Sequence, residues 1–256
     1  MKKIKFVYFD LDHTLWDFDK NSKNAMNIIY RELIEKHDKN NIGFINFFNT
    51  YDDYNQKMWD LYRKKEISKN ELKYKRFKDV FDMLEIDLSD EEIKNLDDIY
   101  LKKLSMQKEL HANVTETLDY LYKKYSLGIL TNGFVEVQHK KMESSGIEKY
   151  FKIVITSEES GTLKPDRKIF DYAAEKCGIE AKNIVYIGDD LQNDIIAAKN
   201  AGFQGIYFNY RNTAYDKNIT AISNMSEIRK ILWLSVINYN CLKNQKHLYL
   251  LYIQLF

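Results

Sequence analysis

The sequence predicts an α/β protein in which a parallel β-sheet carries helices on both faces and an all-helical segment follows the first strand. Three patterns support this fold class. A short apolar run at residues 6–9 leads into two aspartates, and residues 21–104 then show apolar side chains at helical spacing without a convincing strand. From residue 113 onward, short apolar runs alternate with helical patterns. Such alternation implies right-handed βαβ crossovers and therefore a parallel sheet.

The first predicted strand is Phe6-Val7-Tyr8-Phe9, whose near-continuous apolar character suits a strand covered on both faces. Asp10 and Asp12 follow it directly, and because side chains alternate along extended backbone, both carboxylates project to the same side. Two carboxylates so close together repel each other unless a cation lies between them or one keeps its proton. Taken alone, these residues also fit an ordinary acidic turn at the end of a strand.

The inserted segment is predicted to contain four or five helices. Two of their starts are marked in the sequence. Ser68 with Glu71, and Ser89 with Glu92, match the capping box, in which each side chain satisfies a free amide at the beginning of a helix. These signals place a helical block between the first strand and the rest of the sheet.

Four further strands are predicted downstream, at residues 125–130, 153–155, 184–187 and 205–208. The helical patterns among them cover residues 114–124, 134–145, 168–177 and 194–200. In an open parallel sheet, ligands bind beyond the carboxyl ends of the strands. The residues that follow each strand are therefore the candidates for function.

Carboxylates, one lysine, and small hydroxyl or amide groups stand at these strand ends. They are Asp10, Asp12, Thr14, Thr131, Asn132, Lys164, Asp189, Asp190 and Asp194. Mg²⁺ prefers oxygen ligands and is often bound by one or two carboxylates together with a phosphate oxygen. Phosphoryl transfer depends mainly on positioning and charge neutralisation, and a carboxylate can be its nucleophile. The set therefore predicts Mg²⁺-assisted phosphoryl chemistry, although a helix cap or a strand-end turn would explain several of its members singly.

Four ordered segments of the chain resemble the motifs of the haloacid dehalogenase (HAD) superfamily. They are Asp10-Leu11-Asp12-His13-Thr14, Thr131-Asn132-Gly133, Lys164-Pro165-Asp166, and Gly188-Asp189 with Asp194. The resemblance implies a three-layer Rossmann-like core with an inserted α-helical cap of class 1. It assigns residues 1–16 and 108–232 to the core and residues 17–107 to the cap, and it leaves 233–256 as a C-terminal extension of unknown role.

A narrower resemblance concerns the noncanonical pyrimidine 5′-nucleotidase subgroup. It is carried by Leu15-Trp16-Asp17-Phe18, by Thr131-Asn132-Gly133-Phe134 with Gln138, and by Lys164-Pro165-Asp166 with Ile169-Phe170. Related phosphatases share parts of these segments. The implied substrate is a nucleoside monophosphate.

The superfamily resemblance also implies a role for each residue of the site. Asp10 would be the nucleophile and a metal ligand, and Asp12 the general acid/base, with its backbone carbonyl offered to the metal. Thr131 and Asn132 would bind the phosphoryl oxygens, and Lys164 would balance their charge.

The remaining implied roles concern the metal and the cap. Asp189 would ligate Mg²⁺ directly, whereas Asp194 would act through water or orient Lys164. Asp190 occupies a position that is often serine in the subgroup, so its place in the metal shell stays open. Phe18, at the entry to the cap, is a candidate for stacking on a substrate base, and core packing is the alternative.

The expected activity is hydrolysis of a phosphomonoester through an aspartyl-phosphate, with a pyrimidine nucleoside 5′-monophosphate as the substrate. Two alternatives stay open. The chain could be a phosphoglycolate or sugar-phosphate phosphatase, or a phosphomutase, of the same fold, or a catalytically idle module that binds a phospho-ligand. Asp12 speaks against the idle module, because binding alone does not require an acid/base. It also speaks against a dehalogenase, whose motif typically lacks this residue.

Composition limits the other classes of protein. The formal net charge is +1, so no global field attracts nucleic acid or acidic membranes. Cys177 and Cys241 are the two cysteines, too few for a disulfide framework. No apolar run approaches the roughly 20 residues of a membrane span. From the composition we expect a cytoplasmic protein. The superfamily resemblance implies a monomer or homodimer whose partner is a small-molecule phosphate ester.

Overall fold

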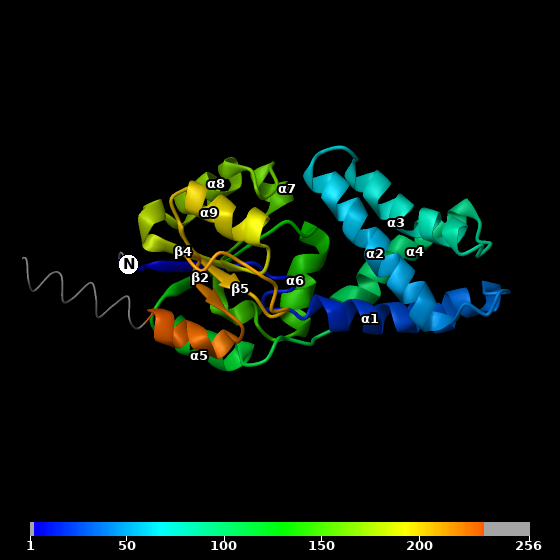
Figure 1. Ribbon diagram of the computed structural model, residues 1–256, viewed down its shortest axis with the longest axis horizontal. Coiled ribbons are helices and arrows are strands. Elements are labelled where there is room, and N and C mark those ends of the chain that lie inside the picture. The colour runs from blue at the N-terminus through cyan, green and yellow to red at the C-terminus, as the bar shows by residue number, and fades with distance from the viewer. Residues whose placement is uncertain (1–2, 233–256) are drawn as a thin grey trace, which may run out of the picture. The chain divides into compact units, whose positions relative to one another are not determined.

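The computed structural model describes residues 3–232 of the 256-residue chain, so the predicted 233–256 extension lies outside the described residues. The described chain forms two compact units. Unit 1 comprises residues 3–17, 110–135 and 147–232, and unit 2 comprises residues 18–109 and 136–146. The first unit carries the sheet and the second is helical (Figure 1).

Unit 1 is built on a six-stranded sheet in the order β3-β2-β1-β4-β5-β6, and every neighbouring pair is parallel. The strands are β1 (Phe6–Phe9), β2 (Ser126–Thr131), β3 (Phe151–Thr156), β4 (Ile184–Gly188), β5 (Gln204–Phe208) and β6 (Ala221–Ile222). The first five confirm the predicted strands. β6 was not predicted, because two residues are too short to show a strand pattern.

Helices cover both faces of this sheet, which confirms the α/β class (Figure 1). The longer segments are α5 (Val114–Tyr122), α8 (Arg167–Cys177), and the continuous pair formed by η5 (Leu191–Ile196, π-helical) and α9 (Ala197–Asn200). Short turns complete the unit: η3 (Glu148–Tyr150), α7 (Ser157–Ser160), η4 (Ala181–Asn183) and η6 (Met225–Glu227).

α8 and α9 lie on one face, where Phe170 and Ala198 join a buried cluster with Tyr8 of β1 and Tyr186 of β4. α5 lies on the other face (Figure 1).

The helix predicted for residues 194–200 begins earlier than expected. It starts at Leu191, because the Asp190 carboxylate accepts hydrogen bonds from the amides of Gln192 and Asn193, both at 2.9 Å. Asp190 is therefore the N-cap of η5. The first turn of this segment carries Asp194 back toward the end of β4, where Asp194 Oδ2 accepts a hydrogen bond from the Asp190 amide at 3.1 Å.

Unit 2 is a bundle of helices with a polar pair inside. Its elements are α1 (Phe18–Ile29), η1 (Tyr30–Ile34, π-helical), η2 (Glu35–His37), α2 (Gly43–Arg63), α3 (Lys69–Met83), α4 (Asp90–Ser105) and all but the first residue of α6 (Val135–Ser144). Both predicted capping boxes, at Ser68 and Ser89, are confirmed. The Arg76 guanidinium is buried, lies 5.1 Å from the Tyr100 ring, and donates to Asp97 at 2.9 Å. No helix within residues 3–232 is both long and apolar enough to cross a membrane.

The register of the three central strands brings the candidate residues together. Phe9, the last residue of β1, is level with Ile129 of β2 and Ile187 of β4. All three strands run in the same direction, so the residues that follow them leave the sheet at one edge. Asp10 is thereby placed between the ends of β2 and β4.

Candidate active site

The loop after β1 folds back tightly on itself. Its anchor is the Asp10 amide, which donates to the Ile187 carbonyl of β4 at 2.9 Å. The Leu11 carbonyl then accepts from the amides of Leu15 and Trp16, at 3.0 and 2.9 Å. The Thr14 hydroxyl is buried and donates to Asp189 Oδ1 at 3.1 Å. The loop is therefore tied to the end of β4 by both main chain and side chain, and Thr14 orients one carboxylate of the site.

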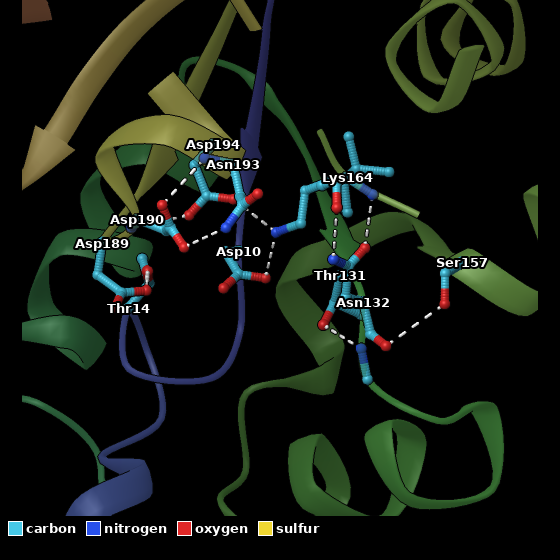
Figure 2. Close-up of polar contacts among 12 residues, drawn as sticks. Asp10, Thr14, Thr131, Asn132, Ser157, Lys164, Asp189, Asp190, Asn193 and Asp194 are labelled. Carbon is cyan, nitrogen blue, oxygen red and sulfur yellow. Dashed lines mark hydrogen bonds and ion pairs between the residues drawn. The ribbon is translucent and has the colours of Figure 1, made fainter. Parts of the chain in front are cut away.

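Three carboxylates meet at this edge of the sheet. Oxygen atoms of Asp10, Asp189 and Asp194 all lie within 4.8 Å of one another. Figure 2 shows the Asp10 and Asp194 side chains converging on Lys164, with Asp189 beside Thr14. Gly188 makes this approach possible, because a Cβ there would lie 2.2 Å from Asp194 Oδ2. The three aspartates were predicted from the sequence, whereas the need for a glycine before Asp189 was not.

Lys164 places its ammonium between two of these carboxylates. Its Nζ lies 2.9 Å from Asp10 Oδ1 and 2.7 Å from Asp194 Oδ1. It also donates to the phenol oxygen of Tyr186 at 2.8 Å. Tyr186 belongs to β4 and was predicted only as a strand residue. The even-odd alternation of β4 could have placed its side chain on one face, but only the tertiary structure shows that it reaches the lysine.

The electrostatics of this cluster favour a bound cation. Burial raises the pKa of the Asp10 carboxyl to about 8; Lys164 opposes this rise and the neighbouring carboxylates add to it. Burial likewise raises the pKa of Asp189 to about 6, with His13 opposing and Asp194 contributing. Burial disfavours the charge of Lys164, but Asp10 and Asp194 outweigh that effect and raise its pKa. One ammonium among three carboxylates leaves excess negative charge, which a divalent cation would neutralise.

The donor atoms of this cluster fit magnesium. All three ligand atoms are carboxylate oxygens, the hard donors that Mg²⁺ prefers, and among residues 3–232 no nitrogen or sulfur ligand typical of zinc joins the cluster. Asp194 already contacts Lys164, so its carboxylate can serve both the lysine and a cation. Asp190 is not part of this cluster, and its carboxylate is used as the cap of η5.

Asn132 is engaged with the segment that carries the lysine. Its side-chain amide donates to the Lys164 carbonyl at 3.0 Å and accepts from the Lys164 amide at 2.8 Å (Figure 2). The Thr131 hydroxyl, buried at the end of β2, accepts from the Gly133 amide at 3.1 Å. The Asn132 side chain thus fixes the main chain of Lys164. The predicted contacts of Thr131 and Asn132 with a phosphoryl group stay predictions.

The two other predicted site residues lie in different surroundings. Asp12 is half-buried in the loop after β1, where its backbone pairs with that of Trp16. Phe18 is the first residue of α1 in unit 2, half-buried, with the Lys141 ammonium 5.4 Å from its ring centroid. The acid/base role of Asp12 and the substrate contact of Phe18 stay predictions.

The parallel α/β core thus carries Asp10, Lys164 and an acidic cluster that could hold a metal ion at one edge of its sheet. The chain belongs to the haloacid dehalogenase-like hydrolase family, whose sequence profile matches residues 4–202. The predicted superfamily membership is therefore confirmed.

Several relatives have names that describe an activity. The pyrimidine 5′-nucleotidase YjjG of Escherichia coli (strain K12) is 26% identical over 235 residues, which are 90% of this chain and 98% of YjjG. The pyrimidine 5′-nucleotidase PynA of Streptococcus pneumoniae is 31% identical over 211 residues, 80% of this chain and 84% of PynA. A glyceraldehyde 3-phosphate phosphatase of Pyrococcus abyssi is 29% identical over 224 residues, 81% of this chain and 82% of that protein.

A solved structure shows the same fold. YfnB of Bacillus subtilis, crystallised with bound magnesium, superposes with a TM-score of 0.80 at 24% sequence identity. The match covers 90% of this chain and 99% of that one. It confirms the predicted architecture, a parallel sheet with a helical region inserted between β1 and β2.

Proposed function

We propose that this protein is a Mg²⁺-dependent phosphomonoester hydrolase that works through an aspartyl-phosphate on Asp10. The observation that carries the proposal is the meeting of the Asp10, Asp189 and Asp194 carboxylates, in which the buried Lys164 ammonium pairs with Asp10 and Asp194. The cluster combines a nucleophile, a cation site and a fixed positive charge at one sheet edge. These are the parts that phosphoryl transfer requires.

Asp10, Asp189 and Asp194 are the residues that would hold the cation, which supplies positive charge to the phosphoryl oxygens when bound. An Asp10 carboxylate oxygen forms a bond to phosphorus while the bond from phosphorus to the ester oxygen breaks. Asp12, protonated at this stage, gives its proton to the departing alkoxide. Lys164 neutralises charge on the transferred group, and the Thr131 hydroxyl donates a hydrogen bond to it.

The second half-reaction releases phosphate. Asp12, now a carboxylate, takes a proton from a water molecule whose oxygen attacks phosphorus. The bond from phosphorus to Asp10 breaks, and the electron pair returns to the Asp10 carboxylate. Inorganic phosphate leaves with the new oxygen, and Asp12 is again protonated for the next cycle. The full cycle consumes the ester and one water molecule, releases the alcohol and inorganic phosphate, and needs no oxidant or reductant.

For the substrate we propose a pyrimidine nucleoside 5′-monophosphate. The names of YjjG and PynA support this choice, and both align with most of this chain. The second candidate is a small sugar phosphate, since a relative from Pyrococcus abyssi is named a glyceraldehyde 3-phosphate phosphatase. We also propose that residues 17–107 act as the cap of the core and that Phe18 contacts the substrate.

The reaction is tested by hydrolysis of a chromogenic phosphomonoester with and without Mg²⁺. We expect Mg²⁺-dependent release of phosphate that is abolished in Asp10→Asn. Asp171→Asn is a suitable control, because it alters an exposed carboxylate on α8 that pairs with Arg167 at 3.2 Å. Absence of hydrolysis by the wild type at every pH, or substantial turnover by Asp10→Asn, would overturn the proposal.

The substrate is tested separately by comparing kcat/KM values. The panel includes pyrimidine and purine nucleoside 5′-monophosphates, glyceraldehyde 3-phosphate and phosphoglycolate. We expect the pyrimidine nucleotides to have the highest values, and Phe18→Ala to raise their KM selectively. A higher kcat/KM for a sugar phosphate would replace the substrate assignment and leave the reaction mechanism standing.

A further inference from the structure

Tyr186 is a fully buried tyrosine in direct contact with the lysine of the site. Its phenol oxygen accepts a hydrogen bond from Lys164 Nζ at 2.8 Å, and its hydroxyl lies within donor distance of the Leu130 carbonyl, at 2.8 Å, and of Asp194 Oδ1, at 3.3 Å. A lysine ammonium has three N–H donors. Asp10, Asp194 and the Tyr186 phenol supply one acceptor for each of them.

The hydrogen bond between Tyr186 and Leu130 spans three strands of the sheet. Tyr186 belongs to β4 and Leu130 to β2, and the strand order places β1 between them. The Tyr186 side chain therefore passes across the end of β1 and reaches the main chain of β2 one residue before Thr131. Through Tyr186, the Lys164 ammonium is linked to β2, the strand that ends at Thr131.

We propose that Tyr186 is a positioning residue of the reaction: its phenol fixes the direction of the Lys164 ammonium, so that the charge stays aimed at Asp10 and the transferred phosphoryl group. This inference rests on the proposed function and adds a residue to the same site. Without the phenol oxygen, one N–H of a buried ammonium would lack its acceptor. The side chain would then rotate toward other acceptors and lose its fixed direction.

The expected effect falls on turnover more than on binding. The ammonium neutralises charge that moves onto the phosphoryl oxygens in the transition state, so its exact direction matters most there. Loss of a hydrogen bond to a charged group corresponds to about a tenfold to hundredfold decrease in rate. We therefore expect Tyr186→Phe to lower kcat by about that factor while KM changes by less than about threefold.

The chain contains a matched control in Tyr8. This residue is level with Tyr186 in the register of β1 and β4, is equally buried, and belongs to the same apolar cluster. Its phenol also donates to a backbone carbonyl, that of Ala173, at 2.9 Å. Tyr8→Phe therefore removes a comparable buried hydrogen bond without touching the contacts of Lys164.

Both variants are measured for kcat, KM, unfolding temperature and inhibition by orthovanadate and by inorganic phosphate. Vanadate resembles the pentacoordinate transition state, whereas phosphate resembles the product. We expect similar losses of unfolding temperature, but a fall in kcat and weaker vanadate inhibition only in Tyr186→Phe. If Tyr8→Phe lowers kcat as much, or if Tyr186→Phe keeps the wild-type kcat, the positioning role is refuted.

A crystal structure of each variant gives a result that does not depend on activity. We expect Lys164 Nζ to move away from Asp10 in Tyr186→Phe and to stay in place in Tyr8→Phe. If the wild type hydrolyses no phosphomonoester and the lysine nevertheless moves, the proposed function fails and the positioning holds. A lysine that keeps its place in Tyr186→Phe refutes the positioning, whatever the activity.

Discussion

Gly188 gives a sharp test of how closely the site is packed. Substitution by alanine would place a Cβ 2.2 Å from Oδ2 and 2.6 Å from Cγ of Asp194. Ordinary contact begins near 3.4 Å, so the Asp194 carboxylate would have to retreat by about 1 Å. Its Oδ1 lies 2.7 Å from Lys164 Nζ, and a shift of that size takes the pair beyond hydrogen-bonding distance.

Two consequences follow for Gly188→Ala. Misplacing a catalytic group by about 1 Å can cost about a hundredfold in rate, so we expect kcat/KM to fall by roughly that factor. Overpacking a buried site costs about 1–3 kcal/mol, so the free energy of unfolding should fall by a similar amount. Because Asp194 belongs to the carboxylate cluster, the Mg²⁺ concentration needed for half-maximal activity should rise as well.

The control is Gly128→Ala in β2. A Cβ there would lie 2.5 Å from the Tyr8 ring and 2.9 Å from the Phe6 ring, which are in the core rather than in the site. We expect a comparable loss of stability with little change in kcat/KM of the folded protein or in Mg²⁺ dependence. Both variants are assayed by Mg²⁺ titration of activity and by urea unfolding. Wild-type activity and Mg²⁺ dependence in Gly188→Ala would refute this account of the site.

Three further predictions concern the cation, unit 2 and the lysine segment. Mg²⁺ at roughly one hundred times its Kd should stabilise the protein by about 2.7 kcal/mol, measured by thermal unfolding, and Asp189→Asn should remove most of this gain. Burial raises the pKa of Asp189 to about 6, and protons compete with the cation for its carboxylate. Mg²⁺ affinity should therefore rise as the pH rises through this range. An affinity that falls instead would contradict the assignment of Asp189 as a Mg²⁺ ligand. Asp97→Ala leaves the buried Arg76 charge without the Asp97 carboxylate and should lower the free energy of unfolding by about 3–5 kcal/mol. An Arg76→Met, Asp97→Leu double variant, which removes both charges, should recover much of this loss. Asn132→Ala removes both hydrogen bonds to the Lys164 main chain and should lower kcat/KM by about tenfold or more; an unchanged value would mean that the segment keeps its place without them.

Much of the site could be predicted because its polar residues come directly after predicted strands in the sequence. The apolar run before Asp10 marks a strand, and parallel strands deliver the residues after them to one edge of the sheet. Ser68 and Ser89 were predictable for a similarly local reason, because a capping box joins residues only three positions apart. Local patterns of this kind need no knowledge of the fold beyond the neighbouring turn.

The sequence by itself determined the family, the order of the strands along the chain, and the aspartates and lysine that gather at the sheet edge. Only the tertiary structure decided how these groups are held. Asp190 caps η5 instead of joining the carboxylate cluster, Asn132 binds the Lys164 main chain, and Tyr186 reaches across β1 to the ammonium. Each of these outcomes depends on contacts between residues distant in sequence or on where a helix begins. Strand and helix patterns report which face a side chain occupies, and they carry no information about which partner from another strand it meets there.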